Sequence, residues 1–409
     1  MLQALRSVAS LLLGAGLLIL GNGLVGIVLP VRMSLERVPT QISGLVMACY
    51  YAGLVAGCLW GRGVISRVGH VRAFAAFAAT VAAATLLYAL WFDPVAWAIL
   101  RVVSGFCMAG LFATIESWLN LRSSKESRGK ILSLYMVISY LASTVGQLLV
   151  NIWSVKGLEL FCLGDMLLSL SLVPIVLTHV TGPQMGRSAP LSLIKLYRIS
   201  PLGVVASTGA GLVSGAFYGM GAIFAANIGM PVLDISIFMG VTLIGGLAIQ
   251  WPIGWASDRH DRRTVLLWVL VGVAVVCLLE FAMSFMPFGT RGLLLLTLLF
   301  GGGAATIYPL AVAHAFDYVE RDQMVPASAG MLLAWALGAT TGPNLASSLM
   351  TAGGSWALFL YLSGVAAALA LFVRYRMSRR AALPAGAQAK FAPRAEAAVL
   401  AGTLDPRTE

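Results

Sequence analysis

Four charged side chains stand inside long apolar runs of the sequence, where a membrane would surround them. They are Arg101, Glu116, Asp165 and Glu280. A charge in hydrocarbon is costly, so such residues usually face a cavity or a partner and often belong to a substrate or proton pathway. A carboxylate can take up and release a proton, whereas the guanidinium of Arg101 stays charged at physiological pH. These residue types predict proton-coupled chemistry, with Arg101, Glu116 and Asp165 as candidates.

Two of these charges also have simpler structural explanations. Arg101 can hold its own helix in place by pairing with another group or by donating to carbonyl oxygens. Glu116 follows Arg101 by fifteen residues, which places it about 22 Å further along the same helix and near its end. There Glu116 can pair with an arginine from one of the neighbouring loops. Both alternatives stay open at this point.

The composition of the chain explains why such charges are few. Of its 409 residues, 59% are hydrophobic and only 11% are charged, against about 25% charged residues in soluble domains. The charges cluster between apolar runs of about 20 residues, which is the length of helix that crosses roughly 30 Å of hydrocarbon. Because every backbone polar group must be satisfied within lipid, these runs predict an all-α integral membrane protein.

The apolar runs predict twelve transmembrane helices in two bundles of six. In chain order we expect them at 8–29, 42–60, 71–91, 95–119, 129–153, 160–180, 201–227, 234–252, 264–285, 292–315, 326–350 and 356–375. The first run is too long for a signal peptide and is expected to stay as an uncleaved span. The expected domains are an N-terminal bundle over 1–180, a linker over 181–200, a C-terminal bundle over 201–380 and a tail over 381–409. The tail is rich in Ala, Pro and Gly, which predicts disorder.

The distribution of basic residues predicts the orientation of the chain. With the N-terminus in the cytoplasm, 22 of the 27 Lys and Arg residues face the cytoplasm and four face the outside. Cytoplasmic loops accumulate Lys and Arg, so we expect a bacterial inner-membrane protein with both termini cytoplasmic. The net charge of +11 is spread over those loops and the tail, where anionic membrane lipid is the expected partner. It therefore does not indicate binding of nucleic acid.

A charged motif recurs in the two halves of the chain. Residues 254–263 read Gly-Trp-Ala-Ser-Asp-Arg-His-Asp-Arg-Arg, and a degenerate copy occupies residues 62–71. In that copy Ser66 stands where Asp258 stands in the other. A repeat at about half the chain length predicts two halves of similar structure.

These features together resemble a known family of membrane proteins. Twelve helices, two six-helix halves and the motif Gly-x-x-x-Asp-Arg-x-x-Arg-Arg at 254–263 resemble the major facilitator superfamily of secondary transporters. Residues 101–105, Arg-Val-Val-Ser-Gly, are similar to its fourth-helix motif, with Ser in place of Gln, which implies a role of Arg101 in proton coupling or anion binding. Residues 115–119 (Ile-Glu-Ser-Trp-Leu) and 308–314 (Tyr-Pro-Leu-Ala-Val-Ala-His) resemble its bacterial YcaD-like branch. The resemblance implies transport of some small molecule.

The resemblance also implies a role for the repeated motif. In this superfamily the connection between the second and third helix of each half meets the other half when the cavity opens outward. It therefore implies a cytoplasmic gate at Gly254, Asp258, Arg259, Arg262, Arg263, Ser66, Arg67 and Gly69. We expect Asp258 to meet the positive end of the helix that begins at Gly129. The alternative is that Asp258 and its arginines only fix the topology of the loop.

Polar and aromatic side chains near the midplane are candidates for a substrate site. In this superfamily fold the ninth helix is peripheral, which favours Asp165 over Glu280 as the proton carrier. The candidates on expected cavity helices are Asn22, Tyr140, Gln147, Ser214, Tyr218, Tyr308, Trp335 and Asn344. Each of them alone can be a packing residue, but as a set they predict a largely neutral cavity. We therefore expect a neutral, weakly charged or amphipathic organic solute.

Other functional classes find less support in the sequence. No Gly-Lys-Ser/Thr follows the glycines at 301–303, which argues against a nucleotide site. The four histidines share no metal-ligand spacing and the five cysteines stand singly, so we expect neither a metal, a cofactor nor an enzyme. A transporter-derived sensor or scaffold, and a lipid or drug exporter of the same fold, remain alternatives. We expect a monomer; substrate, direction and coupling ion stay open.

Overall fold

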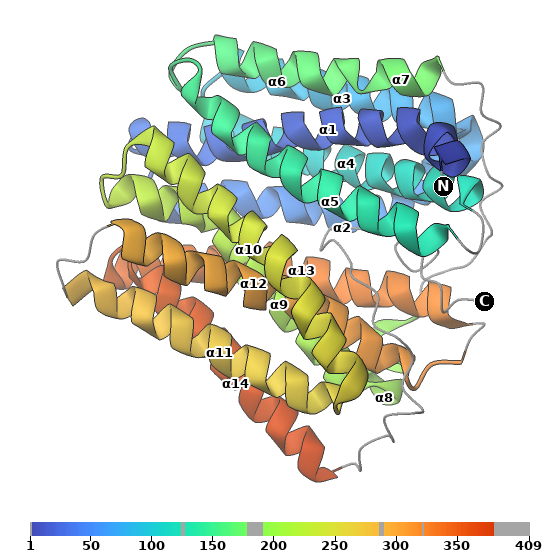
Figure 1. Ribbon diagram of the computed structural model, residues 1–409. Helices are drawn as coiled ribbons and strands as arrows, with labels where there is room; N and C mark the ends of the chain where they lie inside the picture. The colour runs from blue at the N-terminus through green and yellow to red at the C-terminus, as the bar shows by residue number, and fades with distance from the viewer. Residues whose placement is uncertain (1, 124–126, 178–190, 286–289, 321–322, 380–409) are drawn as a thin grey trace.

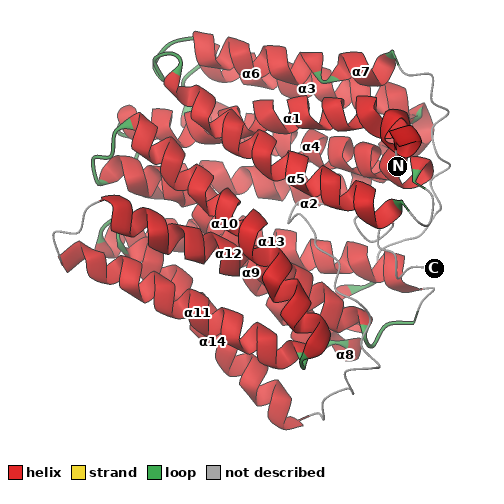
Figure 2. Ribbon diagram, in the orientation of Figure 1, coloured by secondary structure: helices red, strands yellow, loops and turns green. Residues whose placement is uncertain are grey.

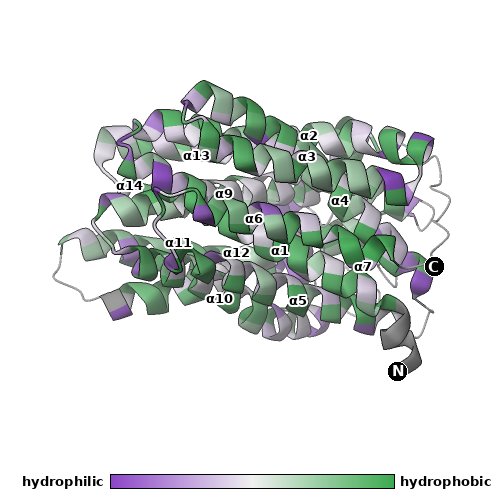
Figure 3. Cartoon of the chain, turned by 90° about the horizontal axis from the view of Figure 1, so that it is seen from above, coloured by the Kyte–Doolittle hydropathy of each residue, from purple (hydrophilic) through white to green (hydrophobic). Residues whose placement is uncertain are grey.

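The computed structural model describes residues 2–123, 127–177, 191–285, 290–320 and 323–379. Over these residues the chain is helical apart from short connections (Figure 2). Twelve segments of this part are long and apolar enough to cross a membrane. Apolar residues run along most of each helix in Figure 3. The predicted all-α class and the number of spans are therefore confirmed.

The two halves of the chain form two bundles that lie one above the other in Figure 1. The first contains α1 (Leu2–Leu35), α2 (Thr40–Val68), α3 (His70–Leu90), α4 (Pro94–Arg122), α5 (Arg128–Leu148), the 3₁₀ turn η1 (Leu149–Asn151), α6 (Glu159–Leu170) and α7 (Leu172–Val176). The second contains α8 (Leu193–Ile199), α9 (Pro201–Asn227), α10 (Val232–Arg259), α11 (Arg262–Ala282), η2 (Met283–Phe285), α12 (Thr290–Phe316), α13 (Met324–Gly353) and α14 (Ala357–Arg379). The end where α1 begins and α14 ends is called the termini end below, and the opposite one the far end.

At the termini end, α2 and α10 run well beyond their expected bounds. The second span was expected to end at residue 60 and the eighth at residue 252, but α2 continues to Val68 and α10 to Arg259. Pro252 lies inside α10, because membrane helices tolerate proline where neighbouring groups satisfy the freed carbonyl. Gly69, with φ of 84°, ends α2. The repeated charged motifs therefore lie mostly in helices, and the prediction that they form loops is wrong.

The sixth span is interrupted rather than continuous. The run expected at 160–180 forms α6 and α7, which are separated at Ser171, and residues 178–180 lie outside the described part. Pro174 has no N–H to donate to the carbonyl of Leu170, which removes one helical hydrogen bond next to the interruption. The hydroxyl of Ser171 donates to the carbonyl of Leu168 at 2.6 Å.

The linker between the halves contains a helix that the sequence analysis did not expect. This helix, α8, buries Leu196 completely. Just before it, the backbone N–H of Leu191 donates to the carbonyl of Pro326 at 3.0 Å. The described end of the linker is thus attached to the start of α13. Residues 181–190 of the linker and the expected tail at 381–409 lie outside the described part.

Glycines set the distance between α2 and α4. A side chain at Gly53 would collide with the backbone carbonyl of Val102, and one at Gly105 with the carbonyl of Tyr50. Small residues at such positions let two membrane helices approach until their backbones touch. Arg101 on α4 is thereby held beside Tyr50 on α2.

The halves touch each other at mid-span and toward the far end. Near the far end, Ser34 donates to the Oδ1 of Asn227 at 3.0 Å, and the Nδ2 of Asn151 donates to the hydroxyl of Ser236 at 2.9 Å. At mid-span, the rings of Tyr51 and Trp335 meet edge to face, with centroids 6.1 Å apart. These contacts join α1 to α9, η1 to α10 and α2 to α13.

Candidate functional site

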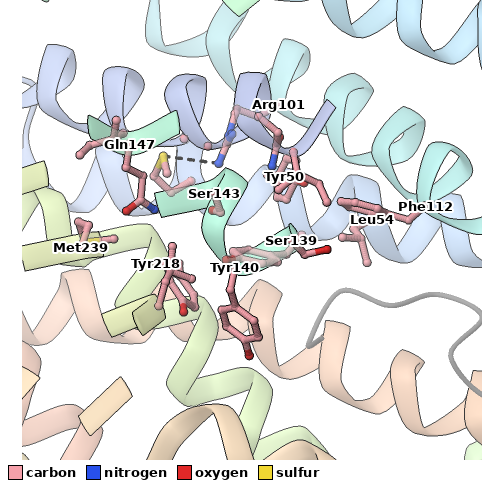
Figure 4. Close-up of a pocket in the computed structure, with 18 of the residues that line it drawn as sticks. Tyr50, Leu54, Arg101, Phe112, Ser139, Tyr140, Ser143, Gln147, Tyr218 and Met239 are labelled. Carbon is pink, nitrogen blue, oxygen red and sulfur yellow. Dashed lines mark hydrogen bonds between the residues drawn. The ribbon is translucent and has the colours of Figure 1, made fainter. Parts of the chain in front are cut away.

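A cavity of about 240 Å³ lies between the two halves. Its lining comes from α1, α2, α4 and α5 of the first half and from α9, α10 and α13 of the second. Figure 4 shows residues of both halves facing this space. The volume is slightly below the range of about 300 to 1,000 Å³ that is typical of small-molecule sites.

Arg101 is the charged residue of the cavity lining. Its side chain is 6% exposed, its guanidinium carbon lies 4.5 Å from the centre of the Tyr50 ring, and its Nη2 donates to the sulfur of Met47 at 3.8 Å. The Nε of Arg101 has no hydrogen-bond partner. In the described part of the chain no carboxylate comes within 4.0 Å of this guanidinium. The cavity therefore contains a buried cation held by a ring face and a thioether.

Further polar atoms of the cavity wall are also unsatisfied. The Oε1 of Gln147 on α5 and the Nε1 of Trp335 on α13 are buried and have no hydrogen-bond partner. The two residues come from opposite halves of the protein. Buried polar groups are usually satisfied by a protein group, water or a ligand. An acceptor and a donor are thus available to a bound molecule, in addition to Arg101.

The rest of the wall is largely apolar and aromatic. It includes Ile19, Ile27, Leu54, Phe112, Met239 and Leu243, together with the rings of Tyr51 and Trp335. A mostly apolar wall with a few polar atoms is the usual composition of a site for an organic molecule. The apolar groups provide binding energy, and the polar atoms fix the orientation of the ligand.

Most of the predicted cavity residues line this space, and some do not. Arg101 and the candidates Asn22, Tyr140, Gln147, Tyr218 and Trp335 line it. The other three are placed elsewhere: Ser214 is 3% exposed in α9, Tyr308 packs 6.3 Å from Trp335, and Asn344 donates to the carbonyl of Thr340. All three lie on the expected helices. For Asn344, nine residues from Trp335, the difference is an angular position about 180° around α13. Ser214 shares a helix face with Tyr218 but lies one turn away from it, and the described lining includes no residue of α12, the helix of Tyr308.

Several lining residues escaped the sequence analysis. On α5 the unpredicted side chains of Tyr135, Ser139 and Ser143 line the cavity together with the predicted Gln147, at intervals of four residues. Residues at that spacing share one face of a helix, so this stripe was readable from the sequence. Met47 and Tyr50 on α2 carried no comparable signal, because their position depends on the glycine contact with α4.

Glu116 lies inside the first half, apart from the cavity lining. Its side chain is fully buried in α4, and it interacts electrostatically with Arg62 of α2 and with Tyr135 of α5. The structural alternative placed an arginine of a loop beside Glu116. The arginine is present, but it belongs to helix α2.

The two other buried or half-buried carboxylates are also distant from the lining. Asp165 is half-buried on α6, which packs against α1 and α3. Glu280 is fully buried on α11, and its Oε1 accepts a hydrogen bond from Thr297 of α12 at 2.9 Å. Neither residue lines the cavity between the halves.

The second copy of the charged motif forms a compact network. Arg262 is buried and its Nη1 donates to Asp317 at 2.9 and 3.0 Å and to the carbonyl of Ala313 at 2.8 Å. Asp258 lies 3.8 Å from the Nη2 of Arg262. The network ties the start of α11 to the end of α12, and the sequence analysis did not identify Asp317 as its partner.

Asp261 caps α11 next to this network. It accepts hydrogen bonds from the backbone N–H of Arg263 at 3.0 Å and from its guanidinium at 2.8 Å. Partial burial raises the pKa of Asp261, but the hydrogen bonds and the charge of Arg263 outweigh this effect and hold the pKa below its ordinary value. The carboxylate is therefore ionised at neutral pH.

The first copy of the motif carries a serine where the second carries Asp258. Ser66 is exposed and its hydroxyl donates to the carbonyl of Gly63 at 3.0 Å. In the second copy, the guanidinium of Arg259 stacks on the Trp255 ring at 3.9 Å. The expected contact between Asp258 and the start of α5 involves a region whose side chains are only partly described, so it stays a prediction.

Comparisons with known proteins agree with this architecture. The family model described as Major Facilitator Superfamily matches residues 11–241 and 202–403. A relative from Escherichia coli O45:K1 (strain S88 / ExPEC), named an uncharacterized MFS-type transporter YcaD, is 29% identical over 366 residues, or 88% of this chain and 93% of the relative. The resemblance to this branch is confirmed.

Solved structures show the same fold at lower sequence identity. The nucleoside transporter NupG has a TM-score of 0.71 and 16% identity, covering 90% of this chain and 100% of the other. A D-xylose-proton symporter has a TM-score of 0.68 and 14% identity, covering 89% of this chain and 96% of the other. On the family match and the twelve-helix fold, the chain belongs to the major facilitator superfamily.

Proposed function

We propose that the protein is a secondary active transporter that moves a small organic solute across the inner membrane by alternating access. The observation that carries this proposal is the cavity, because residues of both halves line it at mid-span. Rocking of one half against the other around such a site exposes it to either side in turn. The two compared transporters, named for nucleosides and for D-xylose with protons, have the same fold.

The orientation follows from the basic residues. Among the described residues, the termini end carries most of the Lys and Arg, which favours a cytoplasmic location of this end. The contacts of Ser34 with Asn227 and of Asn151 with Ser236 then lie at the outer side. In this conformation the halves are therefore held together toward the outside of the cell.

Coupling to protons is assigned to Glu116. This carboxylate is fully buried and interacts electrostatically with the cation Arg62 of α2. Protonation of Glu116 would remove its attraction for Arg62 and loosen the contact between α4 and α2, which also holds Arg101. Asp165 is less suited to this role, since it is only half-buried and lies on α6, which packs mainly against α1 and α3 rather than at the contact between α2 and α4.

Uptake into proteoliposomes tests the proposal. Purified protein is reconstituted and screened over sugars, nucleosides, organic acids, drugs and lipids, with and without an inward proton gradient. The Glu116→Gln variant should lose gradient-driven accumulation and keep solute exchange, whereas Glu159→Gln, an exposed carboxylate at the start of α6, should behave like the unmodified protein. Normal accumulation by Glu116→Gln would remove the coupling assignment. A sensor or scaffold of the same fold would move none of the solutes.

A further inference from the structure

The cavity has an unbalanced charge. Arg101 is cationic, and every other lining residue is neutral: aromatic, aliphatic, hydroxyl or amide. Tyr50, whose ring lies 4.5 Å from the guanidinium carbon of Arg101, is a phenol that is neutral at neutral pH. The described lining therefore has a net charge of about +1.

No carboxylate of the span is placed to compensate this charge. Glu116 stands fifteen residues further along α4, about 22 Å away by helical rise, and interacts electrostatically with Arg62. Asp165 and Glu280 lie on α6 and α11, outside the lining. Arg101 is thus unlike Arg262, which is also buried but donates to the carboxylate of Asp317 at 2.9 Å.

An uncompensated buried guanidinium is costly. Removing such an ion from water costs several kcal/mol, and the cost is repaid only by an opposite charge with good hydrogen-bond geometry. The Tyr50 ring and the Met47 sulfur offset part of this desolvation cost, and the Nε of Arg101 has no hydrogen-bond partner. The planar guanidinium can bind a carboxylate through two parallel hydrogen bonds. The missing counter-ion is therefore best supplied by the ligand.

We propose that the cavity binds a small organic monoanion, with its carboxylate on Arg101 and its apolar body between Phe112, Met239 and Trp335. The inference rests on the proposed transport function and names its substrate class. One cation calls for one negative charge, because a second would remain buried without a partner. The unsatisfied Oε1 of Gln147 and Nε1 of Trp335 suit a hydroxyl or amide on the body of the ligand. The expected range of neutral, weakly charged or amphipathic solutes is thereby narrowed to a weakly charged, amphipathic one.

Matched pairs of a carboxylate and its amide test this inference. Binding of benzoate, phenylacetate and hexanoate, and of benzamide, phenylacetamide and hexanamide, is measured by calorimetry on the purified full-length protein. Each carboxylate should bind roughly 10- to 100-fold more tightly than its amide, the factor expected for hydrogen bonds to a charged group. Arg101→Gln should abolish this ratio and leave the affinity for the amides unchanged. Arg101→Lys should keep part of the ratio.

The control removes an arginine elsewhere. Arg72→Gln changes the net charge equally, but Arg72 is exposed on α3, so the ratio should stay as in the unmodified protein. Equal affinity for carboxylates and amides, absence of binding by every carboxylate, or an unchanged ratio in Arg101→Gln overturns the inference. If the protein transports neutral solutes alone, the proposed transport function stands and the monoanion proposal fails. If it binds carboxylates tightly but moves no solute, the monoanion site stands and the transport function fails.

Discussion

The guanidinium carbon of Arg101 lies 4.5 Å from the centre of the Tyr50 ring, so the cation of α4 rests on an aromatic face of α2. Such a contact contributes about 0.5 to 2 kcal/mol, depending on its exposure to water. It also fixes the direction of the guanidinium without neutralising it. The ring thereby presents Arg101 to the cavity while leaving its charge available.

Replacement of Tyr50 should therefore affect anion binding through the ring rather than through the hydroxyl. Tyr50→Phe keeps the aromatic face and should leave carboxylate affinity nearly unchanged. Tyr50→Ala should weaken it by roughly 2- to 30-fold, which corresponds to the loss of the cation–π contact. Calorimetry with benzoate measures both variants. An equal loss in Tyr50→Phe would assign the effect to the hydroxyl.

Membrane topology can be checked with single cysteines. The five natural cysteines, of which Cys162 is exposed, are first replaced by serine. Pro190→Cys and Ala395→Cys should then react with an impermeant thiol reagent only after the inner membrane is opened, because the basic residues place both positions in the cytoplasm. Arg37→Cys is the positive control for the outer side. Labelling of position 190 or 395 in intact cells would contradict the orientation.

Asp258 is expected to act as a latch for the conformation closed to the cytoplasm. An anion at a helix N-terminus contributes about 0.3 to 2 kcal/mol, which shifts a two-state population by roughly 2- to 30-fold. Asp258→Asn should favour the form open to the cytoplasm and slow transport at normal expression. Ser66→Ala should do much less, since Ser66 brings no charge to the equivalent position.

Cysteine accessibility from the two sides of the membrane measures this shift. The observed pair of Asp258 with Arg262 at 3.8 Å lies within one half, so its loss alone would change stability without changing accessibility. Unaltered accessibility together with normal transport in Asp258→Asn would leave the motif with a purely structural role.

The glycine contact between α2 and α4 predicts a large difference between two glycines of the same helix. Gly53→Ala would place a methyl group against the carbonyl of Val102, and overpacking of this kind costs about 1 to 3 kcal/mol. Around Gly63 no atom lies within 4 Å of the added carbon, so Gly63→Ala should be neutral or stabilising by up to about 1 kcal/mol. Thermal unfolding in detergent compares them. Similar melting temperatures would show that α2 and α4 can separate freely.

The sequence predicted the spans well because hydropathy reports directly on contact with lipid. It predicted the helix ends less well: Arg62 and Asp258 were assigned to loops, although a helix can continue beyond the apolar region until a residue such as Gly69 stops it. The interruption at Ser171 follows from Pro174, which the apolar pattern alone does not register. Residues of the linker and the tail lie outside this comparison where the structure does not describe them.

The sequence predicted how far along each span the site residues lie, but not which side of the helix faces the cavity. On α13 Trp335 lines the cavity, whereas Asn344, nine residues further and about 180° around the helix, is not part of the lining. A rotation of about 100° per residue decides which side chain faces the cavity. The sequence also could not show that Arg101 lacks a carboxylate partner among the described residues, because this depends on how the seven helices that line the cavity pack together.

Very short connections at the termini end determine how α2 and α10 can tilt. Gly69 alone joins α2 to α3, and His260 with Asp261 joins α10 to α11. The two helices of each pair can therefore change their mutual angle only at these one or two residues. Tyr50 stands eighteen residues from the end of α2, about 27 Å along the rod. A tilt of about 10° at that base would carry the Tyr50 ring sideways by roughly 5 Å, as far as the width of the ring itself. The position of the Tyr50 ring relative to Arg101 therefore depends on the angle between α2 and α3 at Gly69.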